Sequence, residues 1–319
     1  MDSDHDGLSD ALEQALLIQF APAFLVGRQD CAGIPAEFAP DLETPTVRAE
    51  DGTIYGQVFP VASLSDGLPA VEIHYYHLWK RDCGPHGHAL DTEHAAVLVS
   101  ASDRNLASAK WKAVYWYAAA HENTVCDVSQ IARASTVDGA ERGPKVWISP
   151  GKHASYLNEA LCHGGCGADK CVDMIALQPG RIVNLGEVGH PMNGSLFIAS
   201  RAWPLMAKMS TTNFPPEPIA RLSQLPDTDI AWFRAERHSA QQVIAISSST
   251  EQAIAGGAHN TTTSLSSAAT STGAAISVAQ DDTGHALVKS GAHTGHALGA
   301  AVRAVGEALH LIRKPAKPE

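Results

Sequence analysis

Positive charge is what this sequence most clearly lacks. Its 319 residues include 23 lysines and arginines against 34 aspartates and glutamates, which gives a formal net charge of −11. A nucleic-acid-binding protein would present a basic face, so this balance argues against that partner and is instead compatible with cation binding. Long apolar runs are also missing. The stretch from residue 15 to 26 is interrupted by Pro22 and falls short of the roughly 18 residues of a transmembrane helix.

Familiar catalytic signatures are absent as well. The sequence contains no G-x-S-x-G, no P-loop and no dinucleotide-binding fingerprint, so the enzyme classes that carry these motifs are not indicated. His121 and Glu122 are not followed by the second histidine of H-E-x-x-H, which leaves a zinc protease unsupported. On its motifs the protein leans towards a function without catalysis.

Six cysteines are present, and their even number predicts three disulfides and an oxidising compartment. Reduced thiols in a cytosolic protein are the alternative. In "CHGGCGADKC" the cysteine gaps differ from the C-x₂-C pairs of zinc knuckles, which favours a disulfide-tied loop. Cys126, near His121, is a candidate nucleophile, although a bridge fits the even count better. No signal peptide is present, and we interpret Met1 as standing in place of a removed leader. The cysteines are Cys31, Cys83, Cys126, Cys162, Cys166 and Cys171.

The first residues, "DSDHDGLSDALE", have the pattern of a calcium loop. Such loops need oxygen ligands at positions 1, 3, 5, 7, 9 and 12 and a glycine at position 6. Gly7 fills the glycine position, and a helix is predicted to follow because Leu8, Leu12, Leu16 and Phe20 have helical spacing. The loop resembles those of dockerins and thrombospondin-type repeats, and a solvated acidic terminus is the alternative. The predicted ligands are Asp2, Asp4, Asp6, the Leu8 carbonyl, Asp10 and Glu13.

Residues 53 to 203 have the pattern of a series of short strands. Runs rich in Val, Ile, Tyr and Trp are separated by Gly, Pro, Asn and Asp, with no amphipathic helices between them, which favours an antiparallel β-sandwich. In "WKAVYWYAAAH", strict alternation predicts that Trp111, Ala113, Tyr115 and Tyr117 share one face. The runs are "AVEIHYYHLW", "HAAVLVSA", "WKAVYWYAAAH", "KVWISPGKHASYL", "RIVNLGEV" and "SLFIASRAW".

A second candidate cation site lies in "GHALDTEH". Asp91 and Glu93 are two residues apart, so they face the same side of a strand, and His88 joins them only if the chain turns between. More carboxylates than histidines suit a hard divalent ion such as Ca²⁺ or Mg²⁺, and Asp82 is a candidate fourth ligand. A metal-free catalytic pair and a polar strand end stay open as alternatives. If the site is catalytic, His121 and His153 are candidate general bases.

The stretch "HLWKRDCGPHGHALDTEH" resembles the core of the necrosis-inducing toxin family of plant-associated microbes. The family heptad G-H-R-H-D-W-E reads here as residues 87–93, and His88, Asp91 and Glu93 fall on its metal-contacting positions, with Asp82 near its upstream aspartate. The segment "KVWISPGKHASY" also resembles vacuolar-sorting-type domains that share the sandwich.

This resemblance implies a β-sandwich with a divalent cation near one end, which in the toxins engages glycosylated sphingolipid headgroups in plant membranes. The chain departs from the heptad at Ala89, Leu90 and Thr92, where the family has Arg, His and Trp. These departures argue against lysis of plant cells and leave the cation ligands in place.

The C-terminal tail repeats every 11 residues, and successive copies read "TGAAI", "TGHAL", "TGHAL" and "VGEAL". A period of about 3.67 residues per turn predicts a straight or slightly right-handed helical stripe. Self-association through this stripe, an amphipathic strip on a membrane or on the body, and a disordered linker are the three alternatives. The predicted stripe is Ile254, Leu265, Ile276, Leu287, Leu298 and Leu309.

Together these patterns predict a mainly β protein with four regions: a calcium loop and helix (1–50), a β-sandwich (51–215), a linker (216–242) and a repeat-helix tail (243–319). The predicted function is secreted, cation-dependent binding of a glycan or glycolipid headgroup, with damage to membranes as a further possible effect and a homo-oligomer formed by the tail. The alternatives are a metal-dependent hydrolase using His88, Asp91 and Glu93, and a structural subunit of an extracellular assembly.

Overall fold

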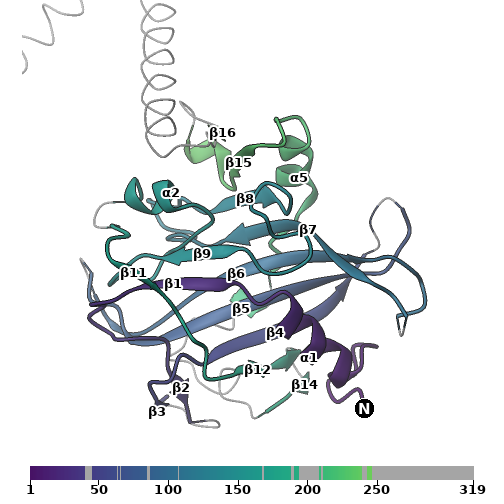
Figure 1. Ribbon diagram of the computed structural model, residues 1–319, viewed down its shortest axis with the longest axis horizontal. Helices are drawn as coiled ribbons and strands as arrows, with labels where there is room; N and C mark the ends of the chain where they lie inside the picture. The colour runs from purple at the N-terminus through teal and green to yellow at the C-terminus, as the bar shows by residue number, and fades with distance from the viewer. Residues whose placement is uncertain are drawn as a thin grey trace, which may run out of the picture. The chain divides into compact units, whose positions relative to one another are not determined.

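The computed structural model describes residues 1–39, 45–62, 64, 66–84, 87–106, 108–166, 169–187, 190–193, 208–209, 211–238 and 243–245. These residues form a mainly β body in which a large sheet packs against a small one (Figure 1). The predicted β-sandwich is therefore confirmed. All strand pairs are antiparallel within the described residues except β1 with β9 and β12 with β4.

The large sheet has eight strands, and two of its inner members, β5 and β6, are the longest. Positions 70–79 of β5 are buried without interruption, because both faces of the sheet are covered. In spatial order the strands are β12 (Ile182–Asn184), β4 (Ile54–Val61), β5 (Ala70–Arg81), β6 (Ala89–Ala101), β7 (Trp111–Ala118), β8 (Gln130–Arg133), β15 (Asp229–Trp232) and β16 (Val243–Ala245).

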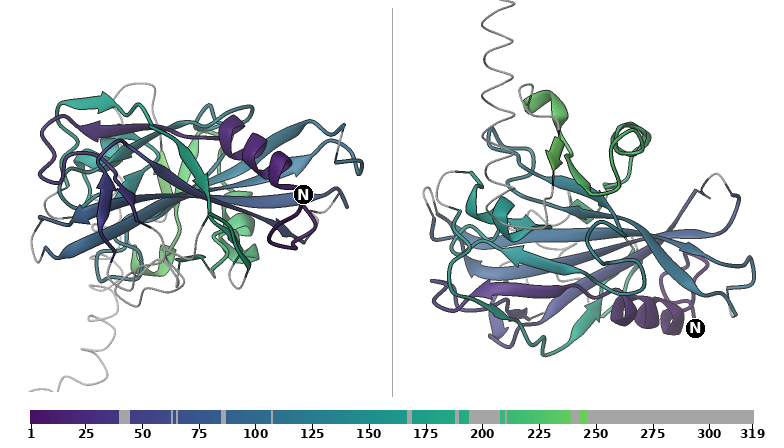
Figure 2. Two further views of the ribbon diagram at one scale, coloured as in Figure 1. Left: turned by 90° about the horizontal axis from the view of Figure 1, so that it is seen from below. Right: turned by 45° about the horizontal axis from the view of Figure 1, so that its top comes forward.

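The small sheet lies over one face of the large sheet, as the two views of Figure 2 show. The main hydrophobic core forms between them, where Phe24 and Val26 of the small sheet meet Ile73, Tyr75 and Val97 of the large one. Its strands are β10 (Ser155–Tyr156), β9 (Lys145–Ile148), β1 (Ala23–Gly27) and β11 (Met174–Ala176), and two further pairs are formed by β2 (Glu37–Phe38) with β3 (Val47–Ala49) and β13 (Gly186–Glu187) with β14 (His190–Pro191).

The predicted N-terminal helix is present as α1 (Asp10–Gln19). Ser9 caps it by accepting a hydrogen bond from the Leu12 amide, and Leu16 and Leu17 are buried in the main core. Polar N-caps of this kind stabilise a helix by about 1 kcal/mol. Figure 1 shows α1 beside β12 and β14, at the edge of the large sheet.

The single face predicted for Trp111, Ala113, Tyr115 and Tyr117 is wrong after Ala113. The register between β6 and β7 shifts there, since Leu98 pairs with Tyr115 and Val99 with Ala113. Val114 is the extra residue of a β-bulge, which moves every later side chain to the opposite face. Trp116 and Ala118 therefore join Trp111 in the main core, while the two tyrosines lie on the other side of the sheet.

The outer face of the large sheet is covered by residues from the region expected to be a linker. The helix α5 (Pro216–Leu222) contributes Leu222 to a cluster with Tyr117 and Ile131 of the sheet. Strand β15 pairs with β8, so this part of 216–242 belongs to the folded body. Two short helices, α2 (Glu159–His163) and the 3₁₀ helix η1 (Ala235–Arg237), complete the described elements.

All six cysteines form disulfides: Cys31–Cys83, Cys126–Cys166 and Cys162–Cys171. Three bridges were predicted, and the zinc-knuckle and Cys126-nucleophile alternatives are wrong because no cysteine is free. Beyond the Val243–Ala245 strand, the repeat tail with its predicted stripe lies outside the described residues, as does the run "SLFIASRAW". In the part of the chain that the structure describes, none of the helices has the length and apolar character needed to cross a membrane.

Candidate functional site

The N-terminal loop gathers Asp2, Asp4 and Asp6, whose ligand oxygens lie within 4.8 Å of one another. Gly7 has a φ of 94°, the left-handed conformation that allows the predicted sharp turn. Asp10 holds the loop closed, since its two oxygens accept hydrogen bonds from the Ser3 amide and hydroxyl, both at 2.8 Å. The structure thus brings together three of the predicted calcium ligands and places Asp10 on Ser3.

Several buried carboxylate oxygens of this loop have no hydrogen-bond donor among the described residues. Asp2 and Asp6 each accept one loop amide, from Gly7 at 3.2 Å and from Leu8 at 2.7 Å. Their second oxygens, both oxygens of Asp4 and one oxygen of Glu13 are buried and without a donor within the described chain. Burying charged oxygens without partners is costly, so the arrangement fits a bound cation. The Leu8 carbonyl stays a predicted ligand.

The pKa values of two glutamates at this loop are raised, which indicates that positive charge is lacking around them. Burial raises the pKa of Glu13 to about 8, and the charges of Asp4 and Asp6 push it in the same direction. Burial also raises the pKa of Glu187 to about 7, again with help from Asp6 and Asp4. A divalent ion would supply the missing charge and reverse these shifts. An oxygen-only set of this size fits Ca²⁺ better than Mg²⁺, which prefers fewer protein ligands and more water.

The second candidate site lies where β5 and β6 leave the sheet. Asp91 pairs with Trp79 and Glu93 with His77, so both carboxylates lie on the sheet face that looks towards the small sheet. The turn that His88 needs occurs at Leu90, which has a φ of 59°. Leu90 is a bulky residue in the left-handed region, a conformation that usually stores strain near functional sites.

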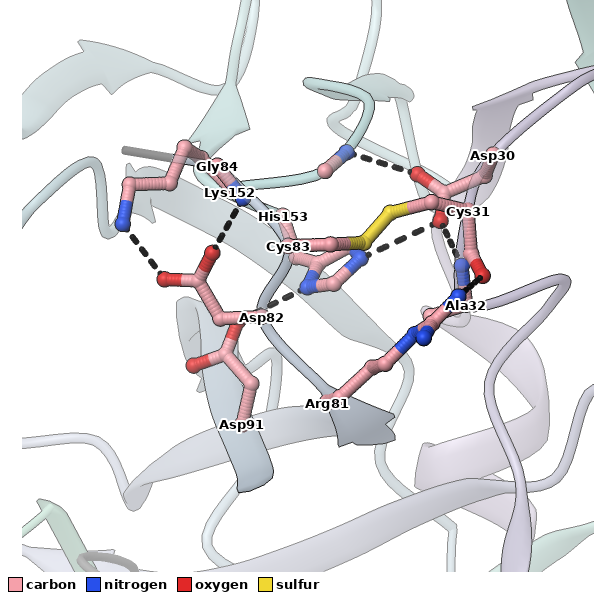
Figure 3. The surroundings of a disulfide bond; sticks show 11 residues. Asp30, Cys31, Ala32, Arg81, Asp82, Cys83, Gly84, Asp91, Lys152 and His153 are labelled. Carbon is pink, nitrogen blue, oxygen red and sulfur yellow. Dashed lines mark hydrogen bonds and ion pairs between the residues drawn. A yellow bond between two sulfur atoms is a disulfide. The ribbon is translucent and has the colours of Figure 1, made fainter. Parts of the chain in front are cut away.

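Asp91 is held by a buried histidine rather than facing His88 directly. Its Oδ2 lies 2.7 Å from His153 Nδ1, and the other ring nitrogen, Nε2, lies 3.4 Å from Asp30 Oδ1 (Figure 3). The imidazole stacks on Trp79 with ring centroids 3.9 Å apart. Burial lowers the pKa of His153, but the two carboxylates outweigh it and raise the value to about 9. These shifts favour the protonated form of His153 and the ionised forms of Asp91 and Asp30, whose pKa values are raised by burial but lowered overall by the histidine.

The disulfide Cys31–Cys83 places two further carboxylates beside this group, as Figure 3 shows. Asp30 precedes the first cysteine and Asp82 precedes the second, and Asp82 Oδ2 lies 2.5 Å from Lys152 Nζ. His88 Nε2 lies 3.7 Å from the same oxygen, and the His88 side chain is 56% exposed. The exposed His88 thus approaches a buried carboxylate, that of Asp82.

Glu93 has its own cationic partner. Lys208 Nζ lies 2.8 Å from Glu93 Oε2 and 2.6 Å from the Thr92 carbonyl oxygen. Burial raises the pKa of Glu93 to about 7, although the Lys208 charge opposes this shift. The structure therefore brings Asp82 close to His88, but it pairs Asp91 and Glu93 with His153 and Lys208 instead of with one another.

The other proposed base, His121, lies in a separate hydrogen-bonded group. Its Nε2 is 2.6 Å from Asp169 Oδ2, which also accepts a bond from the Tyr156 hydroxyl. Burial lowers the pKa of His121, but the hydrogen bond and charge of Asp169 raise it above its ordinary value. His121 and His153 are thus engaged by different aspartates.

A cleft of about 550 Å³ has Lys208, the ion-pair partner of Glu93, in its wall. Glu122 is oriented by the Tyr117 hydroxyl at 2.9 Å, and Asn123 by the Arg234 guanidinium at 3.3 Å. The ring of Phe233 also lines the cleft, and most other lining side chains can donate or accept hydrogen bonds. They include Thr212, Asn213, Glu217 and Glu236.

Sequence reasoning missed Asp30, Lys152, Lys208 and Glu187. Asp30 and Lys152 reach the second site only through the disulfide and the β9–β10 turn, so nothing in their local sequence marks them. Glu187 lies in "RIVNLGEV", which has the pattern of an ordinary strand. Placing Asp30 beside Asp82 would have required the Cys31–Cys83 bridge, which the sequence does not specify among the possible pairings.

Comparison with known proteins finds no matching family model and no matching curated protein. Among solved structures, the chain is similar to one described as NLPPya in complex with glucosamine, with 19% identity over 69% of this chain and 91% of that chain and a TM-score of 0.32. It is also similar to the non-toxic HaNLP3 protein, with 12% identity over 66% of this chain and 96% of that chain and a TM-score of 0.35.

A third similar structure, described as a toxin fold for microbial attack and plant defense, has 17% identity over 54% of this chain and 74% of that chain, with a TM-score of 0.29. The similar structures are thus of the necrosis-inducing type that the heptad resembles. Scores of this size do not identify a ligand or a site residue of this chain. Neither the dockerin- and thrombospondin-type likeness of the first loop nor the vacuolar-sorting likeness is supported by these structures.

Proposed function

We propose that the protein is secreted and binds the headgroup of a glycan or glycolipid in a cation-dependent manner, using the end of the sandwich where β6 begins. The observation that carries this proposal is the cleft whose wall includes Lys208, the partner of Glu93. Its wall combines carboxylate, amide, hydroxyl and guanidinium groups with one aromatic ring. Sugar hydroxyls both donate and accept hydrogen bonds, so they need this mixture of partners.

The two proposed cations have different roles. A calcium ion at the N-terminal loop stabilises the fold. A second divalent ion at Asp82, His88, Asp91 and Glu93 takes part in headgroup binding. Lys152 and His153 would then orient two of its carboxylate ligands, as second partners of metal ligands commonly do. For Glu93 to bind the ion, the Lys208 ammonium has to leave its oxygen.

Secretion is supported by the three disulfides, which persist in oxidising compartments. The alternative function, a metal-dependent hydrolase, is weakened because His153 is unsuited to act as one of its two candidate general bases. His153 is fully buried and both its ring nitrogens face carboxylates, so it has no free nitrogen with which to take a proton from a substrate.

The proposal is tested by calorimetric titration of the full chain with glucosamine, in the presence of calcium. The cleft variants Glu122→Gln and Asn123→Ala are compared with Glu141→Gln, which makes the same chemical change at an exposed residue outside the cleft. We expect saturable binding that weakens on the order of tenfold in each cleft variant, because each loses one hydrogen bond to the ligand. Equal affinities in the three variants would place binding elsewhere and remove the cleft from the proposal.

A further inference from the structure

We infer that Glu187, from the β13–β14 pair, is an additional ligand of the N-terminal calcium ion, so that the ion joins the first residues of the chain to the edge of the large sheet. The inference rests on the calcium loop of the proposed function and extends it. Neither the loop pattern nor the resemblance of the heptad assigns this residue a role.

The coordination of an ion in the N-terminal loop can include a ligand from another segment of the chain. Asp4 is 1% exposed and neither of its oxygens has a donor among the described residues. Glu13 is fully buried, and its Oε1 is likewise without a donor in the described chain. Asp10, the ligand expected at the ninth loop position, instead accepts hydrogen bonds from Ser3. Calcium takes six to eight oxygens, so a replacement from another segment fits its coordination.

Two contacts bring the second segment to the loop. Asn184 Nδ2 donates to Glu13 Oε2 at 3.0 Å across 171 residues of sequence. The His190 ring lies edge-on to His5, with centroids 5.6 Å apart. Glu187 lies between these two residues in the sequence, and after burial the charges of Asp6 and Asp4 are the main causes that raise its pKa.

Glu187 is also oriented for such a role. Its Oε2 accepts a bond from Gln57 Nε2 at 3.4 Å, while its Oε1 is buried with no donor from the described chain. Gln57 lies inside β4 and is fixed in turn by the Tyr76 hydroxyl at 3.1 Å. The turn before Glu187 depends on Gly186, which has a φ of 71°. One carboxylate oxygen is thus held by a residue of the large sheet, while the other has no donor from the described chain.

The chemistry of the ligands selects the ion. The group offers carboxylate oxygens from Asp2, Asp4, Asp6, Glu13 and Glu187 and no sulfur, which suits a hard cation with a high coordination number. The two histidines nearby, His5 and His190, contact each other through their rings. The structure therefore assigns the site to Ca²⁺, and the bound ion would link α1 to the β12 edge of the large sheet.

Calcium titration by calorimetry, followed by hydrogen exchange of residues 184–187, tests this inference on the full chain. His88→Ala is included in every protein, so that the second cation site does not contribute. We compare Glu187→Gln with Asp4→Asn and with the matched control Glu141→Gln. We expect Glu187→Gln to weaken calcium binding on the order of tenfold and to abolish the calcium-dependent protection of residues 184–187, while Glu141→Gln changes neither.

These variants distinguish failure of the calcium loop from failure of the Glu187 assignment. If Asp4→Asn binds calcium as the control does, the calcium loop itself is wrong. If Asp4→Asn loses binding but Glu187→Gln keeps both the affinity and the protection of the control, the loop stands and the assignment of Glu187 is overturned. Should Glu187→Gln unfold, the milder Glu187→Asp replaces it, and unchanged affinity in that folded variant counts against the assignment.

Discussion

Asp91 and His153 are 62 residues apart in sequence and lie 2.7 Å apart in the structure, with the imidazole pressed flat against Trp79. Asp30 faces the second ring nitrogen, so the histidine is enclosed by two aspartates and an indole. This arrangement joins the start of β6, the β9–β10 turn and the loop after β1. It gives the aspartate of the heptad-like motif a structural role that is independent of any bound ion.

Removing His153 should destabilise the protein strongly. The substitution His153→Gln leaves Asp91 and Asp30 buried without their cation, and breaking a buried ion pair in this way costs about 3 kcal/mol. The measurement is urea unfolding at neutral pH, with His163→Gln as the control because His163 is exposed. Equal stabilities of the two variants would show that the buried pair does not contribute.

The Cys31–Cys83 bridge should matter more than the Cys162–Cys171 bridge. Their cysteines are 52 and 9 residues apart, and the loop-closure relation then gives the longer link an advantage of about 1.5 kcal/mol. The double substitutions Cys31→Ser/Cys83→Ser and Cys162→Ser/Cys171→Ser are compared by urea unfolding. The opposite order would contradict the assignment of the first bridge as the link that positions Asp30 and Asp82.

Acid should destabilise the fold through His77. Burial holds the pKa of this histidine well below its ordinary value, and its two nitrogens face Trp79 and Ser155. Because the unfolded chain takes up the proton near pH 6.5, stability should fall as the pH drops below about 6.5 towards the lower pKa of the folded state. Thermal melts from pH 7 to 5 should show a shallower fall in His77→Gln than in the wild type. Parallel curves would exclude His77 as a source of acid sensitivity.

Lys208 should compete with a divalent ion for Glu93. In Lys208→Met the ammonium is lost and its stem is kept, so Glu93 becomes available as a ligand and cation affinity at the second site should rise on the order of tenfold, as one like charge leaves the site. Calorimetric titration with calcium is performed in the Asp4→Asn background, which removes the first site. Lower or unchanged affinity would mean that Glu93 is not a ligand of this ion.

The sequence predicted those features that depend on local pattern. The DxDxDG loop, the helix after Ser9 and the strands of the central sheet follow from spacing and periodicity. The face of β7 was mispredicted because a bulge at Val114 depends on pairing with β6, which no local pattern encodes. Six cysteines indicated three bridges, but their pairing is set by the tertiary fold.

The candidate site was predicted only in part for a similar reason. Asp82, His88, Asp91 and Glu93 are close in sequence and could be recognised as a group. Their partners His153, Lys152 and Lys208 come from distant segments, and these partners decide how much negative charge remains for a cation. His153 was predicted as a candidate base, and the structure places it in the interior with both ring nitrogens facing aspartates.

The most direct test of the proposed function is sedimentation of the protein with phosphatidylcholine vesicles that do or do not contain a glycosylated sphingolipid, in calcium and in chelator. His88→Ala is the main variant, because this candidate ligand is exposed and its removal should not disturb the core, and His163→Ala is its control. We predict that wild type and His163→Ala bind only the glycolipid vesicles and only in calcium, and that His88→Ala binds neither kind of vesicle. Equal binding by His88→Ala and its control, or binding that persists in chelator by folded protein, would contradict it.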